Sequence, residues 1–383
     1  TLAILTNVFR NPAERAKAIG IWSASSGIAV AAGPITGGWL LEHFWWGSVF
    51  FINIPVVIVA VVAAVLVVPE SRDEHVPALD TAGVMLSISA IGALVYTIIE
   101  APEWGWASPT TFAGFAIAAA LIAAFVAWEL RSPNPMLPVR IFENRRFSAA
   151  SVSITSAFFA LFGFIFLITQ YFQLVRGYTP LQAGVRTLPV AASIAVAAVL
   201  APRVVDRFGT SRVVAAGLGS MAIAFAWIST ASATTPYLEV VGQMIVLGAG
   251  LGLTTAPATE SIMGSLSADK AGIGSAVNDT TRELGGTLGV AVIGSVFSSV
   301  YASSLSGGQV FSSLPQQAQD ATADSVGATA IVAGQLDGPA TTAYLSEVSD
   351  AFLSGLSVAC LVVAAVATAG ALFALRVLPA RAG

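Results

Sequence analysis

The chain has 383 residues, of which 56% are hydrophobic and only 10% are charged. Soluble globular domains carry about 25% charged residues, so the composition excludes an ordinary water-soluble fold. The formal net charge of −4 gives no reason to expect nucleic acid as a partner.

Residues that build metal, disulfide and catalytic sites are scarce. The one cysteine, Cys360, stands inside an apolar run and cannot form an intramolecular disulfide, so we interpret it as a buried apolar residue. The two histidines, His43 and His75, are too far apart for an HExxH zinc site, and neither a nucleophile constellation nor a P-loop is present. The sequence therefore predicts neither an enzyme nor an ATP-driven protein, and we expect no metal and no cofactor.

Ten segments are long and apolar enough to cross a membrane as helices, which takes about 20 mostly apolar residues. In chain order they lie at 16–41, 48–68, 82–99, 111–129, 148–173, 183–202, 212–232, 237–257, 273–301 and 351–377. Lipid offers no partners for backbone polar groups, so a spanning segment without the alternation of a barrel strand must be helical. The sequence predicts an all-α integral membrane protein with about ten transmembrane helices.

The basic residues predict which side faces the cytoplasm, because Lys and Arg concentrate in cytoplasmic loops. If the segment before the first span is cytoplasmic, that side holds fourteen of the 17 basic residues: Arg10, Arg15, Lys17, Arg72, Arg131, Arg140, Arg145, Arg146, Arg203, Arg207, Arg212, Lys270, Arg376 and Arg381. Arg176 and Arg186 then lie outside, and Arg282 lies within a span. The long segment 302–350 has acidic residues but no basic one, so we expect it to be an extracellular, acidic and poorly packed loop.

The first span reads GIAVAAGPITGGWLLEHFWW and contains a run of small residues: Gly27, Gly33, Pro34, Gly37 and Gly38. Gly33 and Gly37 form a GxxxG pattern, which lets a second helix approach closely. Pro34 removes a backbone hydrogen bond and bends the helix. A packing kink is the simplest interpretation, but the run also resembles the GPxxGG antiporter motif in the fifth helix of the major facilitator superfamily.

Five other segments extend this resemblance to the 14-helix, EmrB/QacA-type drug:proton antiporter branch. They are NPAERAKAIGIW at 11–22, FFINIP at 50–55, Leu79-Asp80 with Gly83, QYFQLVRGYTPLQAGVRTLP at 170–189 and GSAVNDTTRELGGTLGVAVIG at 274–294. The resemblance implies proton-coupled efflux of amphipathic drugs or antibiotics across the bacterial cytoplasmic membrane. Its partners would be lipid, protons and a small amphipathic substrate.

The resemblance also implies a partial major facilitator fold with three parts. Residues 1–68 would end the N-terminal bundle with family helices five and six, and residues 69–147 would hold two extra central helices and a cytoplasmic loop. Residues 148–383 would form a C-terminal six-helix bundle that includes the 302–350 loop. The first three family helices and most of the fourth are then absent, and we expect a chain without them not to transport alone.

Charged residues inside a span are costly and mark function by default. The span 273–301 carries Asn278, Asp279, Arg282 and Glu283, whose spacing of three and four places them on one helix face. We expect Asp279 and Arg282 to neutralise each other, which leaves Glu283 to bind a proton or a cation. The alternative is an ion-pair network that ties the helix at its cytoplasmic end.

The loop PRVVDRFGTSR at 202–212 is a candidate inner gate. It resembles the second copy of a family loop motif, with Asp206, Arg207 and Gly209 matching and Pro202 in place of a glycine. Its residues would either latch the gate or form a solvated positive loop.

The span 148–173 carries an aromatic row, and its candidate substrate-lining residues are Phe159, Phe162, Phe166, Gln170 and Gln173. They would either bind an apolar cation by stacking and cation–π contact or fill the core and face lipid. The residues leave two other functions open. One is a dedicated exporter of one metabolite or lipid. The other, of a different class, is a non-transporting scaffold or channel.

Overall fold

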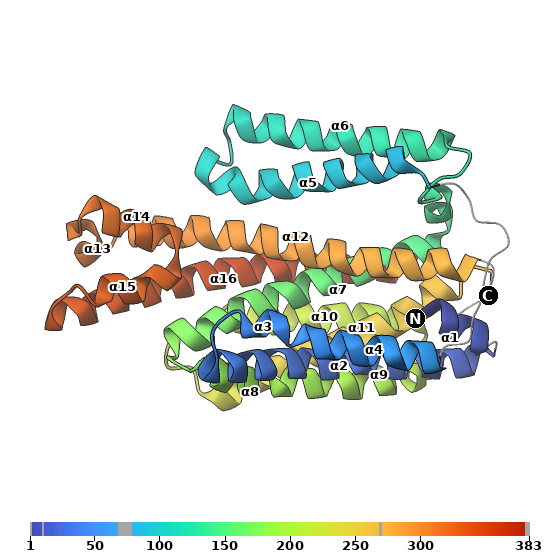
Figure 1. Ribbon diagram of the computed structural model, residues 1–383, viewed down its shortest axis with the longest axis horizontal. Helices are drawn as coiled ribbons and strands as arrows, with labels where there is room; N and C mark the ends of the chain where they lie inside the picture. Colours follow the sequence, from blue (N-terminus) through green and yellow to red (C-terminus); the bar gives the residue numbers. More distant parts are fainter. Residues whose placement is uncertain (1, 10, 68–78, 268–269, 380–383) are drawn as a thin grey trace.

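The computed structural model describes residues 2–9, 11–67, 79–267 and 270–379 (Figure 1). Within these ranges every regular element is helical, and ten segments are long and apolar enough to cross a membrane. Each predicted span coincides with one of these segments, so the predicted all-α membrane fold class is confirmed. Arg10, Arg72, His75 and Arg381 lie outside the described residues.

The first long helix, α2 (Pro12–His43), follows the short α1 (Leu2–Val8). Its start is set by Asn11, whose side-chain oxygen accepts a hydrogen bond from the backbone N–H of Ala13 at 2.9 Å, and by Pro12, which suits the first helical turn. α3 (Ser48–Phe51) packs against α2 and leads into α4 (Asn53–Val67). The apolar side chains at 54–66 of α4 are exposed, as expected for a helix that faces lipid.

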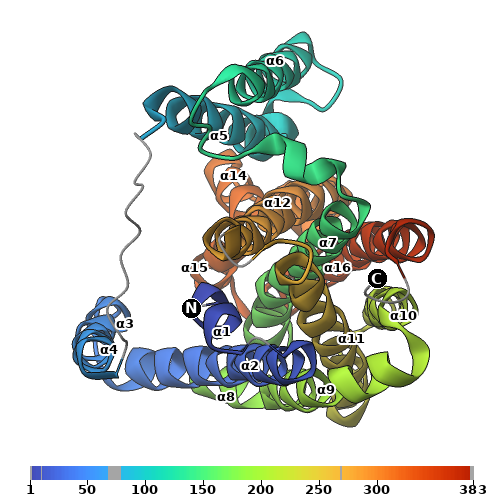
Figure 2. The same cartoon turned by 90° about the vertical axis from the view of Figure 1, so that its right-hand side faces the viewer.

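A helical hairpin, α5 (Thr81–Trp104) and α6 (Pro109–Arg131), lies along one side of the molecule (Figures 1 and 2). It contacts the rest of the structure mainly through the C-terminal half of α5, where Ser295 donates a hydrogen bond to the carbonyl of Ile98 at 2.6 Å. The 3₁₀ turn η1 (Val139–Glu143) connects the hairpin to the helices that follow.

Six spans form the main bundle: α7 (Arg145–Gln170) with its π-helical continuation η2 (Tyr171–Val175), α8 (Pro180–Arg186) with α9 (Leu188–Phe208), α10 (Thr210–Ile228), α11 (Tyr237–Met263), α12 (Ala271–Leu305) and α16 (Gly338–Val377). In Figure 2, α7 lies between α11, α12 and α16. Small residues permit this close packing: a Cβ atom at Gly289 of α12 would lie 2.5 Å from the carbonyl of Phe159 in α7.

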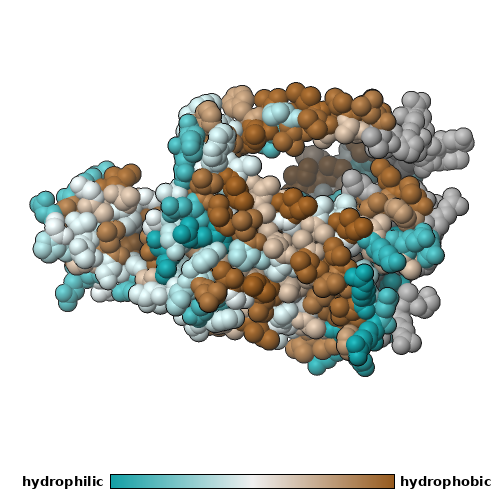
Figure 3. Space-filling view, turned by 90° about the horizontal axis from the view of Figure 1, so that it is seen from below, coloured by the Kyte–Doolittle hydropathy of each residue, from teal (hydrophilic) through white to brown (hydrophobic). Residues whose placement is uncertain are grey.

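The segment 302–350 is a folded lobe, so the prediction of a poorly packed loop is wrong. α12 and α16 extend into it, and α13 (Gln309–Ser313), α14 (Gln316–Asp324), η4 (Val326–Ala328) and α15 (Thr329–Ala333) pack between them. The hydroxyl groups of Thr322 and Tyr344, both fully buried, share a hydrogen bond of 2.7 Å. Glu347 accepts hydrogen bonds from two backbone N–H groups of α13. Figure 3 shows hydrophilic side chains over this lobe and at the opposite end, with apolar ones over the body between.

Candidate functional site

Arg282 of α12 lies where α2, α7, α11 and α12 meet. The centre of its guanidinium group is 4.6 Å from the ring centroid of Trp22 and 4.8 Å from that of Phe158. Its Nη2 donates to the hydroxyl of Thr259 at 3.2 Å, and that hydroxyl donates to Asn278 Oδ1 at 3.1 Å. Each cation–π contact contributes about 0.5–2 kcal/mol, so two rings from different helices hold this cation in place.

Asp279 interacts electrostatically with Arg282, as expected, but from a distance. No ion pair joins them in the part of the chain that the structure describes, and Asp279 Oδ1 instead accepts a hydrogen bond from Asn278 Nδ2 at 3.3 Å. Asp279 and Glu283 are exposed, whereas Asn278 is fully buried and Arg282 is half-buried. The planar guanidinium group of Arg282 stacks on the two rings. The four residues therefore divide between a packed helix face, with Asn278 and Arg282, and an exposed face, with Asp279 and Glu283.

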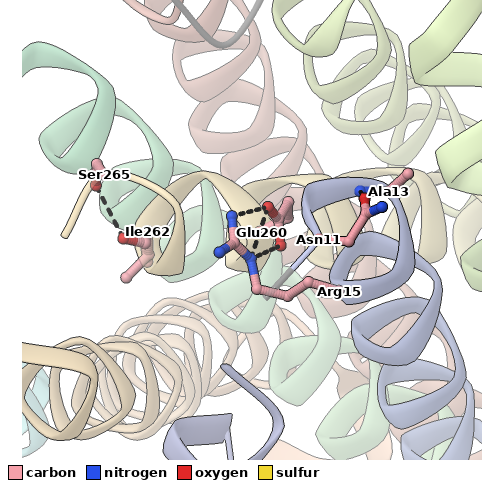
Figure 4. A network of polar contacts seen from close by, with 6 residues as sticks. All are labelled: Asn11, Ala13, Arg15, Glu260, Ile262 and Ser265. Atoms are coloured by element: carbon pink, nitrogen blue, oxygen red, sulfur yellow. Dashed lines mark hydrogen bonds and ion pairs between the residues drawn. The ribbon is translucent and has the colours of Figure 1, made fainter. Parts of the chain in front are cut away.

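An ion pair joins α2 to α11 close to this site. Arg15 Nη2 lies 2.8 Å from Glu260 Oε1, and Arg15 Nε lies 3.2 Å from each carboxylate oxygen (Figure 4). The two side chains are 16% and 17% exposed. Arg146, at the start of α7, is a second cation near Glu260. The pair therefore ties together the two helix ends at the side predicted to be cytoplasmic.

The glycine-rich run of α2 forms a seam with α8 and α9. A Cβ atom at Gly27 would lie 2.8 Å from the carbonyl oxygen of Ala191, and one at Gly38 would lie 2.6 Å from that of Pro180. Real Cβ atoms do not approach so closely, so a larger residue at either position would push the helices apart.

The predicted GxxxG pair does not make this seam. A Cβ atom at Gly33 or Gly37 would meet nothing within 4 Å in the described structure. With 3.6 residues per turn, Pro34 shares a face with Gly27 and Gly38, while Gly33 and Gly37 point elsewhere. The carbonyl of Pro34 lies directly against Gly184 of α8, so the GPxxGG segment and the P-x-Q-A-G segment meet in space.

The aromatic row of α7 does not line a single cavity. Phe166 borders a cavity of about 1030 Å³, and Gln173 borders a separate one of about 230 Å³. Phe159 is buried in the core, Phe162 covers a glycine of α12, and Gln170 donates to the carbonyl of Phe166. Only part of the row can therefore contact one ligand.

The larger cavity lies between α5, α12 and α14. Its described lining includes the carboxyl-bearing residues Glu103 and Asp324 and the aromatic ring of Trp106, and no Lys, Arg or His. Thr287 of α12 also borders it, and Glu283 lies one turn before Thr287 on the same helix face. The α12 wall of the cavity therefore leads toward the exposed carboxylates.

The candidate gate segment is not a loop: α9 continues to Phe208 and α10 begins at Thr210, with Asp206 and Arg207 exposed at the end of α9. Asp206 and Arg207 take part in no ion pair among the described residues. Gly209 separates α9 from α10 at φ = 84°, a conformation that glycine adopts without strain. Among the described residues at this end of the molecule, Arg15 and Glu260 form the ion pair that joins two helices.

Several partners in the site were not recognised from the sequence: Trp22, Phe158, Thr259, Arg15 and Glu260. Arg15 and Trp22 both belong to the segment NPAERAKAIGIW, which was the available signal. Their partners lie far away in the chain; Glu260 comes 245 positions after Arg15. Helix spacing carries no information about such contacts.

Comparison with protein families matches residues 1–290 to the Major Facilitator Superfamily. Among curated proteins, the multidrug efflux pump LfrA of Mycolicibacterium smegmatis is 33% identical over 378 residues, which cover 97% of this chain and 74% of that protein. The multidrug resistance protein Stp of Mycobacterium tuberculosis is 36% identical over 296 residues, 77% of this chain and 55% of that protein. The tetracenomycin C resistance and export protein of Streptomyces glaucescens is 32% identical over 370 residues, which cover 95% of this chain and 69% of that protein. The chain thus spans about half to three quarters of these relatives.

Proposed function

Because the chain belongs to the major facilitator superfamily, we propose that it works by alternating access, in which two groups of helices rock around a site between them. It is a multi-pass transporter of the bacterial cell membrane, and its function is drug efflux, in line with the names of its relatives. We also propose that efflux is driven by protons moving inward and that the protein belongs to the 14-helix branch, as its motifs suggest.

The arrangement of charges and space fits a state that is closed toward the cytoplasm. Arg15 and Glu260 hold α2 and α11 together at the end predicted to be cytoplasmic. The cavity of about 1030 Å³ lies toward the other end, since Asp324 of the lobe and Trp106 after α5 both line it. A substrate in this cavity would leave toward the outside.

One observation supports proton coupling most directly: two exposed carboxylates, Asp279 and Glu283, lie on α12 beside a cation that rings already hold. Arg282 and the two carboxylates together carry one net negative charge. A proton or a cationic substrate can neutralise that charge, and competition between the two would couple their movements.

The lining of the large cavity favours an amphipathic cation as substrate. Trp106 and Phe166 offer aromatic faces, and Glu103 and Asp324 offer negative charge. A dedicated exporter of one compound is the second candidate, since the Streptomyces relative is named for a single compound.

The test is to measure efflux and protein level for Glu283→Gln in the whole protein. We expect weaker export of a cationic dye and a flatter dependence on pH, with unchanged expression. Asp350→Asn, an exposed carboxyl on α16, is the matched control and should behave as the parent protein. Normal, pH-dependent efflux in Glu283→Gln would remove the carboxylates from the coupling mechanism. Export of neutral and cationic compounds by the parent would argue against a dedicated exporter.

A further inference from the structure

Glu129, near the end of α6, is a buried carboxyl group that the transport site does not use. Its side chain is only 3% exposed. Its Oε2 accepts a hydrogen bond from the backbone N–H of Leu137 at 3.0 Å, but its Oε1 has no hydrogen-bond partner among the described residues. A buried charge of this kind is unfavourable unless a cation or a proton neutralises it.

A second carboxylate, Asp80, faces the same space. A Cβ atom built on Gly83 would lie 2.5 Å from Glu129 Oε1 and 2.7 Å from Asp80 Oδ2. The two oxygen atoms therefore border one small volume, which is free only because residue 83 is glycine. This gives a physical reason for the Leu79-Asp80…Gly83 pattern.

The two carboxyl groups differ in their supply of hydrogen-bond donors. Asp80 accepts from the backbone N–H of Gly83 at 2.9 Å and from the indole N–H of Trp128 at 2.9 and 3.1 Å. These donors, the Gly83 N–H first, hold the pKa of Asp80 below its usual value. Asp80 is therefore the ionised member, and Glu129 has one donor for two oxygens.

No cation among the described residues compensates the pair. The other charged groups on the elements that pack against the inner half of the hairpin are half-buried or exposed, and none forms an ion pair with either carboxyl group: Arg131, Arg140, Glu143, Lys270, Asp279, Arg282 and Glu283. Two like charges in one small volume repel each other strongly.

We propose that Glu129 binds a proton and shares it with Asp80 across the space above Gly83, so that the inner end of the α5–α6 hairpin is a proton-binding site. The proton comes from water at the side predicted to be cytoplasmic, and it turns Glu129 Oε1 into a donor toward Asp80 Oδ2. Loss of the proton leaves two facing negative charges. This site is separate from Asp279 and Glu283 and does not depend on the proposed transport function.

The proton would stabilise the connection between the hairpin and the main bundle. Glu129 Oε2 holds Leu137, which lies in the segment between α6 and η1, just before α7. With the proton bound, the hairpin end and this segment stay together. As the pH rises and the proton leaves, repulsion between the two carboxylates loosens them.

Infrared difference spectroscopy tests the proposal on the whole protein in lipid, with the proton itself as the ligand. Between mildly acidic and mildly alkaline pH, the carbonyl band of a protonated carboxyl should appear in the parent and be lost in Glu129→Gln. Asp80→Asn should shift the band and its pH midpoint, because it removes the negative charge that favours the bound proton and leaves a neutral amide in its place. Glu143→Gln, an exposed carboxyl on η1, is the matched control and should change neither.

A band that persists unchanged in Glu129→Gln would overturn the proposal, as would an unchanged midpoint in Asp80→Asn. If Glu129→Gln fails to fold, the same measurement on Gly83→Ala tests the proposal. The methyl group of alanine would enter the space between the two carboxyl groups and should change the band and its midpoint. A band and midpoint unchanged in Gly83→Ala would equally refute a shared proton at this position.

Discussion

Neutralising one end of the Arg15–Glu260 ion pair should open the end of the molecule predicted to be cytoplasmic. Arg15→Gln and Glu260→Gln keep polar side chains but remove one charge each. The pair joins α2 to α11. In alternating access, the group of helices that contains α2 must separate from the group that contains α11 when the cytoplasmic side opens. Each substitution should therefore increase the population of the open state.

The geometry of the pair sets the size of the effect. Three contacts of 2.8–3.2 Å join the two groups, and both side chains are more than four-fifths buried. A hydrogen bond to a charged group contributes about 1.5–3 kcal/mol, more than the roughly 0–1 kcal/mol of an exposed ion pair. At about 1.4 kcal/mol per factor of ten, loss of the pair shifts the equilibrium roughly 10- to 140-fold. Glu260→Gln should have the larger effect, because it leaves Arg146 without its anion as well.

Spin labels on the two helix ends provide the assay. The one native thiol, Cys360, is buried, so labels react selectively at cysteines introduced by Lys17→Cys and Ser267→Cys, two exposed positions. The parent protein should show mainly a short distance between the labels, and Arg15→Gln should add a longer one. Glu14→Gln, which removes a neighbouring exposed charge on α2, is the control and should leave the distribution unchanged.

The charge-reversed double variant Arg15→Glu with Glu260→Arg should restore the short distance, because the pair reforms with opposite polarity. Two results would refute the reasoning: unchanged distances in both single variants, or a double variant that stays as open as either of them. In the first case the pair does not hold the ends together. In the second the single variants act by another route.

Three further predictions concern the glycine seam, the cation of α12 and the folded lobe. Gly38→Leu should lower the free energy of unfolding by about 1–3 kcal/mol, because it overpacks the seam with α8, and Gly37→Leu should lower it much less. Equal losses of stability in a thermal unfolding assay would contradict the observed contact face. Arg282→Lys should lower transport at unchanged expression, because an ammonium group does not stack on two rings; parent-like efflux would show that stacking is dispensable. Tyr344→Phe should destabilise the lobe by about 1 kcal/mol, measured as faster proteolysis of 306–337; no change would mean that the bond to Thr322 contributes nothing.

The spanning helices could be predicted because lipid allows so few solutions. A run of about 20 apolar residues without charge has to be a helix, and each of the ten predicted spans is present. Hydropathy, however, identifies the apolar part of a helix and not the residue at which the helix begins or ends. The last span was predicted to begin at residue 351, but α16 begins at Gly338. The Ser- and Ala-rich composition of 302–350 concealed a lobe held by a few buried residues, such as Tyr344.

The glycine-rich run could be found from the sequence, but its contact face was misjudged. The GxxxG pattern directed attention to Gly33 and Gly37, which face open space. The residues that contact α8 and α9 are Gly27, Pro34 and Gly38. Pro34 follows Gly27 by seven positions, and Gly38 follows it by eleven. Since 3.6 residues make one turn, these intervals return to the same face, and a search for that register would have predicted the seam.

The four residues of the charge cluster lie on α12, but Asp279 and Arg282 interact only from a distance. A spacing of three residues permits an ion pair between Asp279 and Arg282, and nothing in the local sequence argues against one. The guanidinium group instead reaches Trp22 and Phe158 on two other helices. Such contacts depend on how the helices pack around one another, which local periodicity does not specify. For the same reason Glu129, one acidic residue near a helix end, gave no sign that it would be buried beside Asp80.

The cation at Arg282 and the ion pair at Arg15 are linked through two helices. Trp22 and Arg15 both belong to α2, which is one continuous helix, while Thr259 and Glu260 are adjacent on α11. If α2 moves away from α11 as a unit, it must withdraw the ring from Arg282 and the guanidinium from Glu260 together. Arg282 then loses one of its two aromatic partners, and the nearby carboxylates of Asp279 and Glu283 become its best alternatives. A proton on those carboxylates weakens that alternative, so protonation should favour the closed state, and loss of the proton should favour opening.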